Sequence, residues 1–517
     1  GVEVRFLKVS DDQSSGRDVN RCELRINGGS LIAEGTVSDS IVFVSNAESP
    51  DENDWYGIYS RYPGVIRMSY VSFRHASYVF GGGYYNSMAF YGNQSDSLRI
   101  TNSHFRDIGS SIFYTQLYFY ESARGVIKNN KFSDFSNTFI NRAYTYSNSL
   151  LEIDANEFIA PHGQLSSENL TVNEEGSQIR FTNNQSSDRS RIRFNAWTEN
   201  ITADQVIFEG NELTGQGSDE ISFSGSSATG GRFLIKNNTL DSSYVNVFDA
   251  AKALIQGNTI EECTDSYGSG LYVSNSHAVV ENNTITDNRG NGISVYASFD
   301  YQGVKDTIRN NTITGNNTYS SNSRAGIVIS GYGNPVIWTN DLHDNSYYDI
   351  RNNSTVNDID ARFNWWGATT TAEMDEGGNP KNINKIYDYY DDDSRGFVNY
   401  ANWLDASGGS PTAMSETGIV RFTDSDGGDD PHGKDRALGA GLRALTTAPE
   451  GPPTRDGPVA GSPTVAASRV LPATPAEYGH FSSGVDVRLR AAFAARGIER
   501  PYTHQAEAID HALAGRH

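Results

Sequence analysis

The chain repeats a short pattern in which an aliphatic residue, a pair of asparagines and a second aliphatic residue follow one another. The segment from Ile308 to Asn317 reads IRNNTITGNN, and the similar segments IKNNTL, IQGNTI and VENNTI precede it. Ile308 and Ile313 are five positions apart, so an unbroken strand would point their side chains to opposite faces. Both are buried only if the backbone turns between them, and Asn tolerates the left-handed conformation that suits such a turn. The pattern therefore predicts a strand, a corner at asparagine and a second strand.

This unit recurs at an average interval of about 27 residues. Taking the first apolar residue of each unit as its anchor gives eleven anchors: Met68, Ile100, Ile127, Ile153, Phe181, Phe208, Ile235, Ile255, Val280, Ile308 and Ile337. The third residue after the anchor is Asn in nine of the eleven units, and the fifth is apolar in ten. Short β-type segments at this period, without a helical period, indicate a stacked solenoid.

On these repeats, residues 1–406 resemble the right-handed parallel β-helix proteins of the pectate-lyase-like superfamily. The opening also fits that family, with a G-T…I-x-F strand before a W-x-G-I strand, here Gly35, Thr36, Ile41, Phe43, Trp55, Gly57 and Ile58. The resemblance implies an all-β solenoid of about 11–13 rungs, in which each turn of the chain adds strands to parallel sheets. Aligned asparagines would then exchange side-chain amide hydrogen bonds between rungs, as an asparagine ladder.

The repeat ends at the sequence NWWG, which starts at Asn364. The segment that follows resembles the closing part of β-helix proteins related to the periplasmic accessory protein NosD, through Asn364, Trp365, Trp366, Gly367, Ile386, Asp388, Trp403 and Leu404. Asn402 stands where that family has proline. An uncapped solenoid ends in an open sheet edge, so the two tryptophans are expected to cover the last rung. The alternative is that they stack on sugar rings.

The composition changes after Leu404. Residues 411–517 contain no Asn but ten of the 15 prolines, and we interpret residues 407–478 as a disordered linker. Residues 479–517 are expected to form a short helical segment, because Asp486–Arg496 and a run that ends at Gly515 are helix-prone and closed by glycine. The loss of Asn also fits a junction between two unrelated coding segments.

The helical segment contains GIERPYTHQAEAI and resembles the entry segment of superfamily 2 helicases of the DEAD/DEAH type. The matching residues are Gly497, Ile498, Tyr502, His504, Gln505, Glu507, Ala508 and Ile509. The resemblance implies that Gln505 hydrogen-bonds the edge of an adenine base. The sequence contains no G-x-x-x-x-G-K-[ST] phosphate loop, so we expect no helicase activity.

The net charge of −22 argues against sequence-independent binding of the solenoid to nucleic acid or anionic membrane. No apolar run approaches the length of a membrane span, and two cysteines exclude a disulfide scaffold. The chain starts at Gly1 and shows no signal peptide, so an extracellular, periplasmic or surface location is expected from the family resemblance alone.

Two acidic runs are candidates for a hard cation. Asp424, Asp426, Asp429 and Asp430 lie in DSDGGDD, whose glycines and clustered oxygens suit calcium, and calcium is the only cofactor that the sequence suggests. The second run, YDYYDDD, starts at Tyr387. A solvated acidic loop is the alternative for both runs. No H-E-x-x-H motif or Cys/His cluster indicates zinc.

The 28 tyrosines and 24 phenylalanines allow two interpretations: aromatic stacks inside and along a sheet, or an exposed tyrosine-rich face that contacts a glycan. No set of converging carboxylates marks a hydrolase, and no residue is predicted to be catalytic. The leading hypothesis is a secreted or surface scaffold that binds carbohydrate or acts as an adhesin. The alternatives are a polysaccharide lyase or hydrolase, and a fusion or fragment defined by its helicase-like end.

Overall fold

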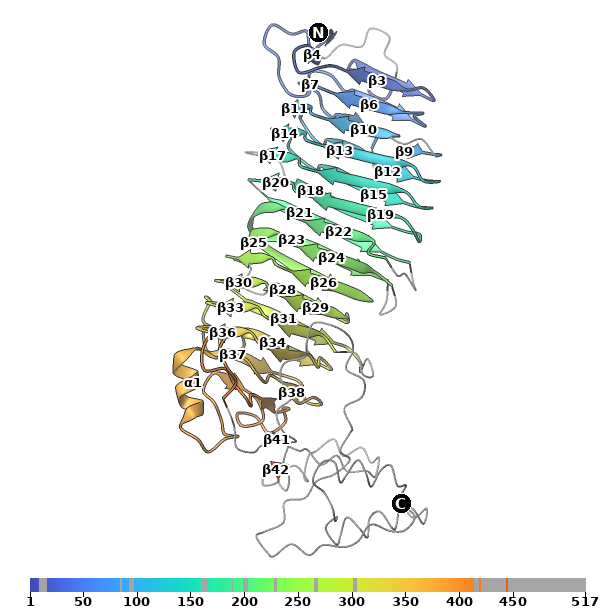
Figure 1. The fold of residues 1–517 in the computed structure, drawn as a ribbon. Helices are drawn as coiled ribbons and strands as arrows, with labels where there is room; N and C mark the ends of the chain where they lie inside the picture. The colour runs from blue at the N-terminus through green and yellow to red at the C-terminus, as the bar shows by residue number, and fades with distance from the viewer. Residues whose placement is uncertain are drawn as a thin grey trace, which may run out of the picture.

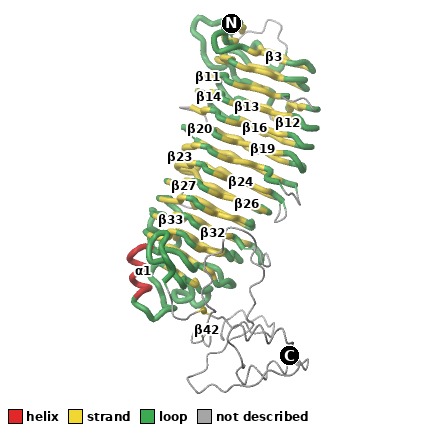
Figure 2. Tube along the Cα trace, in the orientation of Figure 1, coloured by secondary structure: helices red, strands yellow, loops and turns green. Residues whose placement is uncertain are grey.

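The computed structural model describes residues 1–8, 16–83, 86–92, 97–159, 165–187, 189–198, 203–226, 230–264, 268–300 and 305–412, and a short strand pair beyond them. These residues form an elongated stack of rungs that follow one another in chain order (Figure 1). Nearly all of the regular structure is strand, and one helix lies beside the C-terminal rungs (Figure 2). Each rung contributes strands to three faces of the solenoid, called here sheet B, the long-strand face and the short-strand face.

Sheet B contains fourteen strands, each parallel to the next. They are β3 (Leu31–Glu34), β6 (Ile66–Ser69), β10 (Leu98–Thr101), β13 (Arg124–Lys128), β16 (Leu150–Asp154), β19 (Gln178–Thr182), β22 (Val206–Glu209), β24 (Arg232–Lys236), β26 (Lys252–Gln256), β29 (Ala278–Glu281), β32 (Thr307–Arg309), β35 (Val336–Trp338), β38 (Ile359–Asp360) and β40 (Val398–Asn399).

The long-strand face follows a second side of the solenoid. Its strands are β2 (Glu23–Asn27), β5 (Gly57–Arg61), β8 (Phe80–Gly81), β9 (Ser87–Phe90), β12 (Phe113–Phe119), β15 (Ile140–Thr145), β18 (Leu165–Val172), β21 (Ser190–Ala196), the second halves of β23 (Glu212–Gly225) and β25 (Thr239–Phe248), β28 (Ser269–Ser274), β31 (Asn291–Ala297), β34 (Ala325–Gly331), β37 (Tyr348–Asn352) and β39 (Ile386–Tyr387).

The short-strand face completes each rung. Its strands are β1 (Glu3–Phe6), β4 (Ile41–Ser45), β7 (Val71–Arg74), β11 (His104–Arg106), β14 (Lys131–Ser133), β17 (Glu157–Ile159), β20 (Gln185–Ser186), the first parts of β23 and β25, β27 (Thr259–Glu261), β30 (Thr284–Thr286), β33 (Thr312–Thr314) and β36 (Asp341–His343). Because β23 and β25 run through the corner, the long and short strands form one continuous 26-stranded sheet.

The register confirms the repeat that the sequence predicts. Ile100 pairs with Ile127, Ile127 with Ile153, and the later anchors continue this series as far as Ile337. All eleven anchors are at most 1% exposed, so they form one wall of the core. The described chain therefore folds as a parallel β-helix, the class that the sequence predicts.

At the corner after sheet B, one residue adopts the left-handed conformation and the next is a buried Asn. This corrects the sequence prediction, which assigned the turn to the recurring asparagine position itself. The left-handed residue is the second after the anchor, not the third. Its φ lies between 50° and 68° at Tyr70, Asn102, Asn129, Ala155, Asn183, Gly210, Asn237, Gly257, Asn282, Asn310, Thr339 and Phe363. The third residue is the buried Asn. Tyr, Ala, Thr and Phe occupy the turn position in four rungs, so packing of the rungs holds this conformation even where the residue disfavours it.

The buried asparagines form the predicted ladder. Asn211 Nδ2 donates to Asn238 Oδ1 at 2.9 Å and to the carbonyl oxygen of Phe181 at 2.9 Å. Its backbone N–H donates to the same Oδ1 of Asn238 at 2.9 Å. Nine asparagines share this arrangement: Asn130, Asn156, Asn184, Asn211, Asn238, Asn258, Asn283, Asn311 and Asn340. Asn364 ends the ladder as the acceptor from Asn340. The ladder thus satisfies buried polar groups that would otherwise destabilise each corner.

The C-terminal end is covered by a cap that includes helix α1 (Gly367–Asp375). Trp366 is 1% exposed and belongs to the core, whereas Trp365 is half-buried and packs edge-on against His343. Trp403 Nε1 donates to Asp375 Oδ1 at 3.1 Å, which ties the last residues of the cap to the helix. Trp366 therefore belongs to the core at this end of the solenoid, whereas Trp365 does not; that the two tryptophans cover the last rung stays a prediction.

The acidic run at Tyr387 is part buried and part solvated. Asp388 is 3% exposed and accepts hydrogen bonds from the backbone N–H groups of Tyr390 and Val398. Asp392 accepts from Ser394 and pairs with Arg395. Asp391 and Asp393 are exposed, so the expectation of a solvated loop holds for them but not for Asp388.

Beyond residue 412 the structure describes only the antiparallel pair β41 (Gly418–Ile419) and β42 (Arg443–Ala444). The predicted helical segment, residues 479–517, and most of the predicted linker lie outside the described residues. Within the described part of the chain, no helix is long and apolar enough to cross a membrane.

Candidate functional site

Strand alternation places phenylalanine inside the solenoid and tyrosine on its long-strand face. Along β12, Phe113, Leu117 and Phe119 are buried, whereas Tyr114 and Tyr118 are half-buried and point outward. Phenylalanines stack inside the core from rung to rung, for example Phe105 on Phe132 at 5.1 Å. The aromatic residues therefore form stacks inside the solenoid and also a tyrosine-rich outer surface, whose contact with a glycan stays a prediction.

The outward tyrosines gather on consecutive rungs. Tyr91 stacks on Tyr120 with ring centroids 4.9 Å apart, and Tyr120 stacks on Tyr146 at 4.8 Å. Beside this row, Tyr118 stacks on Tyr144 at 4.8 Å. These spacings match the rise of about 4.8 Å between parallel strands. We call these five residues, Tyr91, Tyr118, Tyr120, Tyr144 and Tyr146, the tyrosine face.

Three phenols of the tyrosine face, those of Tyr118, Tyr120 and Tyr146, have pKa values above the usual value. Burial, together with the neighbouring phenols Tyr146, Tyr91 and Tyr118, raises the pKa of Tyr120 to about 12. Burial and neighbouring phenols also raise the pKa of Tyr118 and of Tyr146. The Tyr118 hydroxyl donates to Gln116 Oε1 at 2.6 Å. Neutral phenols both donate and accept hydrogen bonds, so the face combines aromatic surface with polar groups of both kinds.

Amides and charged groups continue the long-strand face beyond the tyrosines. Asn195 Nδ2 donates to Asn169 Oδ1 at 3.1 Å. Two rungs further, Asn246 Nδ2 donates to Glu220 Oε1 at 2.9 Å, and Arg193 pairs with the same carboxylate at 3.4 Å. The outward surface thus passes from aromatic to polar along the solenoid axis.

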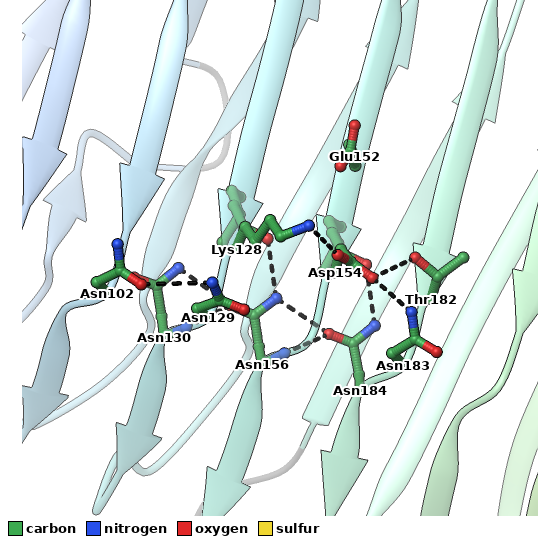
Figure 3. A network of polar contacts seen from close by, with 12 residues as sticks. Asn102, Lys128, Asn129, Asn130, Glu152, Asp154, Asn156, Thr182, Asn183 and Asn184 are labelled. Carbon is green, nitrogen blue, oxygen red and sulfur yellow. Dashed lines mark hydrogen bonds and ion pairs between the residues drawn. The ribbon is translucent and has the colours of Figure 1, made fainter.

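A depression of about 470 Å³ lies on the opposite sheet, sheet B. Its lining is mostly polar and charged, with one aliphatic side chain: Glu152, Asp154, Arg180, Thr182, Asn183, Ile207, Glu209, Gly210 and Asn237. Figure 3 shows the polar network at its edge, next to the asparagine ladder.

Asp154 is the centre of that network (Figure 3). It accepts from Lys128 Nζ at 2.7 Å, from Thr182 Oγ1 at 2.7 Å and from Asn183 Nδ2 at 2.8 Å. Burial acts to raise the pKa of Asp154, but the hydrogen bonds from Lys128, Thr182 and Asn183 outweigh it and leave the pKa below its usual value. The hydrogen bond to Asp154 raises the pKa of Lys128. Asp154 is therefore a fixed anion with an anchoring role rather than a proton-transfer group.

On the short-strand face, the pKa of Glu261 is shifted upward, in the opposite direction to that of Asp154. Burial, and then the charges of Asp241, Glu262 and Asp287, raise the pKa of Glu261. Asp241 and Glu261 are direct register partners on adjacent rungs. Among the described residues, however, no group of three or more His, Cys, Asp and Glu side chains is arranged to hold a metal ion.

The residues that the sequence singled out for cofactor and metal binding lie outside the described residues. They are Gln505, the adenine candidate, and the calcium candidates Asp424, Asp426, Asp429 and Asp430. Their roles stay predictions.

Sequence reasoning missed a second, shorter asparagine ladder. Asn288 Nδ2 donates to Asn316 Oδ1 at 2.9 Å, and Asn316 Nδ2 to Asn345 Oδ1 at 3.0 Å. Asn345 Nδ2 then donates to Asp349 Oδ1 at 2.9 Å, where the ladder ends. The signal was an Asn eight residues after the anchor in three consecutive units, in TITDN, TITGN and DLHDN.

Comparison with known proteins supports the fold. A search of curated proteins and a search of solved structures found no match. The model of one family, described as a right-handed beta helix region, matches residues 174–320. Over those residues the chain is similar to right-handed β-helix regions, in agreement with the stacked parallel rungs of the structure.

Proposed function

We propose that this protein is an extracellular or surface scaffold whose tyrosine face binds an extended carbohydrate chain. The observation that carries the proposal is the pair of stacked tyrosine rows, three residues in one and two in the other, on three consecutive rungs. Because the rings stack face to face, the rows present ring edges and phenol groups to a ligand, and sugars pack C–H groups against such edges and bond their hydroxyl groups to phenols and amides. The tyrosine face offers both kinds of contact, and its polar continuation offers amides and charges to the next units of a chain.

The direction of the stack favours a linear ligand over a compact one. Each step from Tyr91 to Tyr120 to Tyr146 advances one rung along the solenoid axis. A chain that runs along this axis meets a new tyrosine about every 4.8 Å, so successive units meet equivalent contacts. Several modest contacts in series then add to a useful affinity.

The test is a panel of soluble oligosaccharides titrated into the full chain by calorimetry. We expect affinity to rise with oligosaccharide length and to fall when Tyr120 and Tyr146 are both replaced by Ala. Tyr332→Ala is a control, because Tyr332 is an exposed tyrosine in a different part of the chain. Unchanged binding of the longest ligand by the double variant would overturn the proposal.

Cleavage of a glycan is the second candidate function, and it rests on a different observation. Glu261 has a raised pKa beside Asp241 on the short-strand face, and a carboxyl of raised pKa near a second carboxyl is the pairing that glycosidases use. The assay is product formation from a panel of polysaccharides, with calcium and with chelator. Activity that Glu261→Gln abolishes would support an enzyme, and an absence of products from every polysaccharide would exclude it.

A further inference from the structure

Four consecutive rungs of sheet B have aliphatic side chains on the outer surface of the solenoid, on β22, β24, β26 and β29 (Figure 1). They are Ile207, Leu234, Leu254 and Val279, which pair in direct register. Their neighbours along each strand are buried core residues, so strand alternation points these four outward, where each is half-buried. The same position is Glu152 and Arg180 on the two preceding rungs, so the aliphatic run is local. We call these four residues the aliphatic stripe.

Longer polar side chains border the aliphatic stripe on both sides. Side chains two positions apart in a strand point the same way, so the residues two before and two after each stripe residue stand beside it on the surface. One border contains Arg232, Lys252 and His277, and the other contains Glu209, Lys236, Gln256 and Glu281. A partner therefore reaches the stripe between two rows of longer polar side chains.

Two of the charged border residues are compensated within the protein. Glu281 pairs with Arg309 at 2.6 Å, and Arg232 lies 3.8 Å from Asp204. These four side chains therefore contribute no net charge to the surface around the stripe.

The remaining charged border residues place a cation on each side of the stripe. Among the described residues, Lys236, Lys252 and Glu209 form no ion pair. Lys236 follows Leu234 and Lys252 precedes Leu254, so the two lysines lie on adjacent rungs at opposite borders. Glu209 lies at one end, on the first rung of the stripe. The centre of the stripe is thus apolar between two free cations, in a chain whose net charge is −22.

The spacing of the stripe suits a helix that lies along the solenoid axis. Neighbouring rungs are about 4.8 Å apart, and a helix presents a side chain to one side about every 5.4 Å, once per turn. Over four rungs the two repeats stay within about 2 Å of each other. An extended strand presents side chains to one side about every 6.7 Å, so it is out of step by about 4 Å after two rungs.

Two other occupants fit the surface less well. A two-fold axis that lays the stripe of a second copy on this one brings the border of Arg232 and Lys252 either against itself or against the border of Lys236. Both arrangements place like charges in contact. A flat lipid surface would bury the borders together with the stripe, and burying the unpaired carboxylate of Glu209 is costly.

We propose that the aliphatic stripe docks an amphipathic helix of a partner protein, with acidic residues on both edges of the apolar face of that helix. The apolar face covers the stripe, and the acidic edges pair with Lys236 on one side and Lys252 on the other. The outer face of the helix stays in water. Repulsion by the acidic remainder of the chain is screened beyond about 8 Å at physiological ionic strength, whereas the two lysines act at contact.

The test uses two synthetic helical peptides of about 18 residues that share a leucine face. One peptide has glutamates along both edges of that face, and the other has lysines. Fluorescence anisotropy with the full chain measures the affinity of each, and we expect the glutamate peptide to bind about tenfold more tightly. Leu234→Gln combined with Leu254→Gln is expected to weaken its binding about tenfold or more, because two aliphatic contacts are lost.

Charge reversal gives a result that loss of folding cannot imitate. Lys236→Glu combined with Lys252→Glu is expected to weaken the glutamate peptide and strengthen the lysine peptide, so that the preference inverts. Arg25→Glu combined with Arg191→Glu is the matched control, because these exposed arginines lie on the long-strand face and the change in net charge is the same. We expect this control to keep the preference for the glutamate peptide.

Circular dichroism and melting temperature check that each variant is folded. Equal binding of the two peptides, no binding of the glutamate peptide at about 1 mM, or a preference that charge reversal at the two lysines leaves unchanged would each refute the proposal. Dimers in sedimentation that the leucine variant abolishes would assign the stripe to a second copy instead. Binding to phosphatidylserine vesicles that the same variant abolishes would assign it to a membrane.

Discussion

Asn310 and Asn311 are neighbours with opposite roles in the same corner. Asn310 adopts the left-handed conformation, with a φ of 55°, and its side chain is exposed. Asn311 is 2% exposed, donates to Asn340 Oδ1 and to the carbonyl oxygen of Val280, and accepts from Asn283. The first residue turns the chain and the second binds three rungs together.

This division predicts very different costs for two adjacent substitutions. Asn311→Ala removes the ladder hydrogen bonds and leaves buried partners unsatisfied on both sides, so we expect a loss of about 3 kcal/mol or more in the free energy of unfolding. Asn310→Gly keeps the turn and removes an exposed side chain that accepts one hydrogen bond, from Thr339, so we expect a loss of about 1 kcal/mol or less.

Urea unfolding of both variants measures these differences. Equal losses for the two variants would contradict the division of roles.

The end of the second ladder predicts a pH dependence. Asp349 is fully buried, and its Oδ2 has no hydrogen-bond partner among the described residues. Burial raises the pKa of Asp349 from 3.8 to about 7, although a hydrogen bond from Asn345 and the charge of Lys385 oppose the shift. The folded protein therefore holds this carboxyl protonated at a pH where the unfolded chain has released the proton.

Because the pKa is raised on folding, stability is highest below pH 4 as far as Asp349 is concerned, and falls as the pH rises from about 4 to about 7. A shift of this size corresponds to roughly 4 kcal/mol. Asp349→Asn is expected to reduce this loss. Burial also raises the pKa of Asp388 to about 7, so the informative quantity is the difference between wild type and variant in melting temperature across this pH range. Parallel curves for the two proteins would contradict the assignment.

The cap predicts unequal roles for the two tryptophans. Trp366→Ala removes a core side chain and is expected to cost about 3–5 kcal/mol. Trp365 is half-buried, so Trp365→Ala is expected to cost about 1 kcal/mol. Denaturant unfolding gives the two values. If Trp366→Ala instead reduced glycan binding without loss of stability, the residue would be a ligand contact and not a cap.

The tyrosine face predicts a graded loss of affinity. Tyr120 contacts a tyrosine on each side, so Tyr120→Ala is expected to lower the affinity for a long oligosaccharide about tenfold. Tyr120→Phe keeps the ring and removes only the hydroxyl, so we expect a loss of about threefold or less. Calorimetry on the two variants compares the contributions of the ring and of the hydroxyl to the affinity. Equal losses for the two variants would show that the ring contributes nothing beyond its hydroxyl.

The sequence was sufficient for the repeat, the anchors and the main ladder, because buried aliphatic residues and buried amides must recur at every rung. It was insufficient for the turn position, because many units have Asn at both the second and the third residue after the anchor, and the sequence does not show which of the two is left-handed. Ala155 and Phe363 also adopt this conformation without any local signal. It also left open which tyrosines point outward. Strand alternation fixes that only once the first residue of β12 is known to be buried.

The depression on sheet B was beyond sequence reasoning for a different reason. Its lining comes from adjacent rungs, and the distance along the chain between partners varies from rung to rung. Asn183 and Asn237 become neighbours of Gly210 only through the register of β19, β22 and β24. The calcium and adenine candidates stay predictions, since they lie beyond residue 412.

The main ladder has a direction, because each amide donates toward the next rung and accepts from the one before. Interior rungs are therefore interchangeable: a duplicated unit of the chain finds the same acceptor ahead of it and the same donor behind it. The two ends of the ladder differ from its interior. Ser103, at the start, donates to Asn130 Oδ1 only through its backbone N–H, and Asn364 closes the ladder by donating to the carbonyl oxygens of Ile337 and Ala361. Duplication of a unit in the middle of the chain would therefore preserve the ladder, whereas the first and last turns each need a sequence of their own.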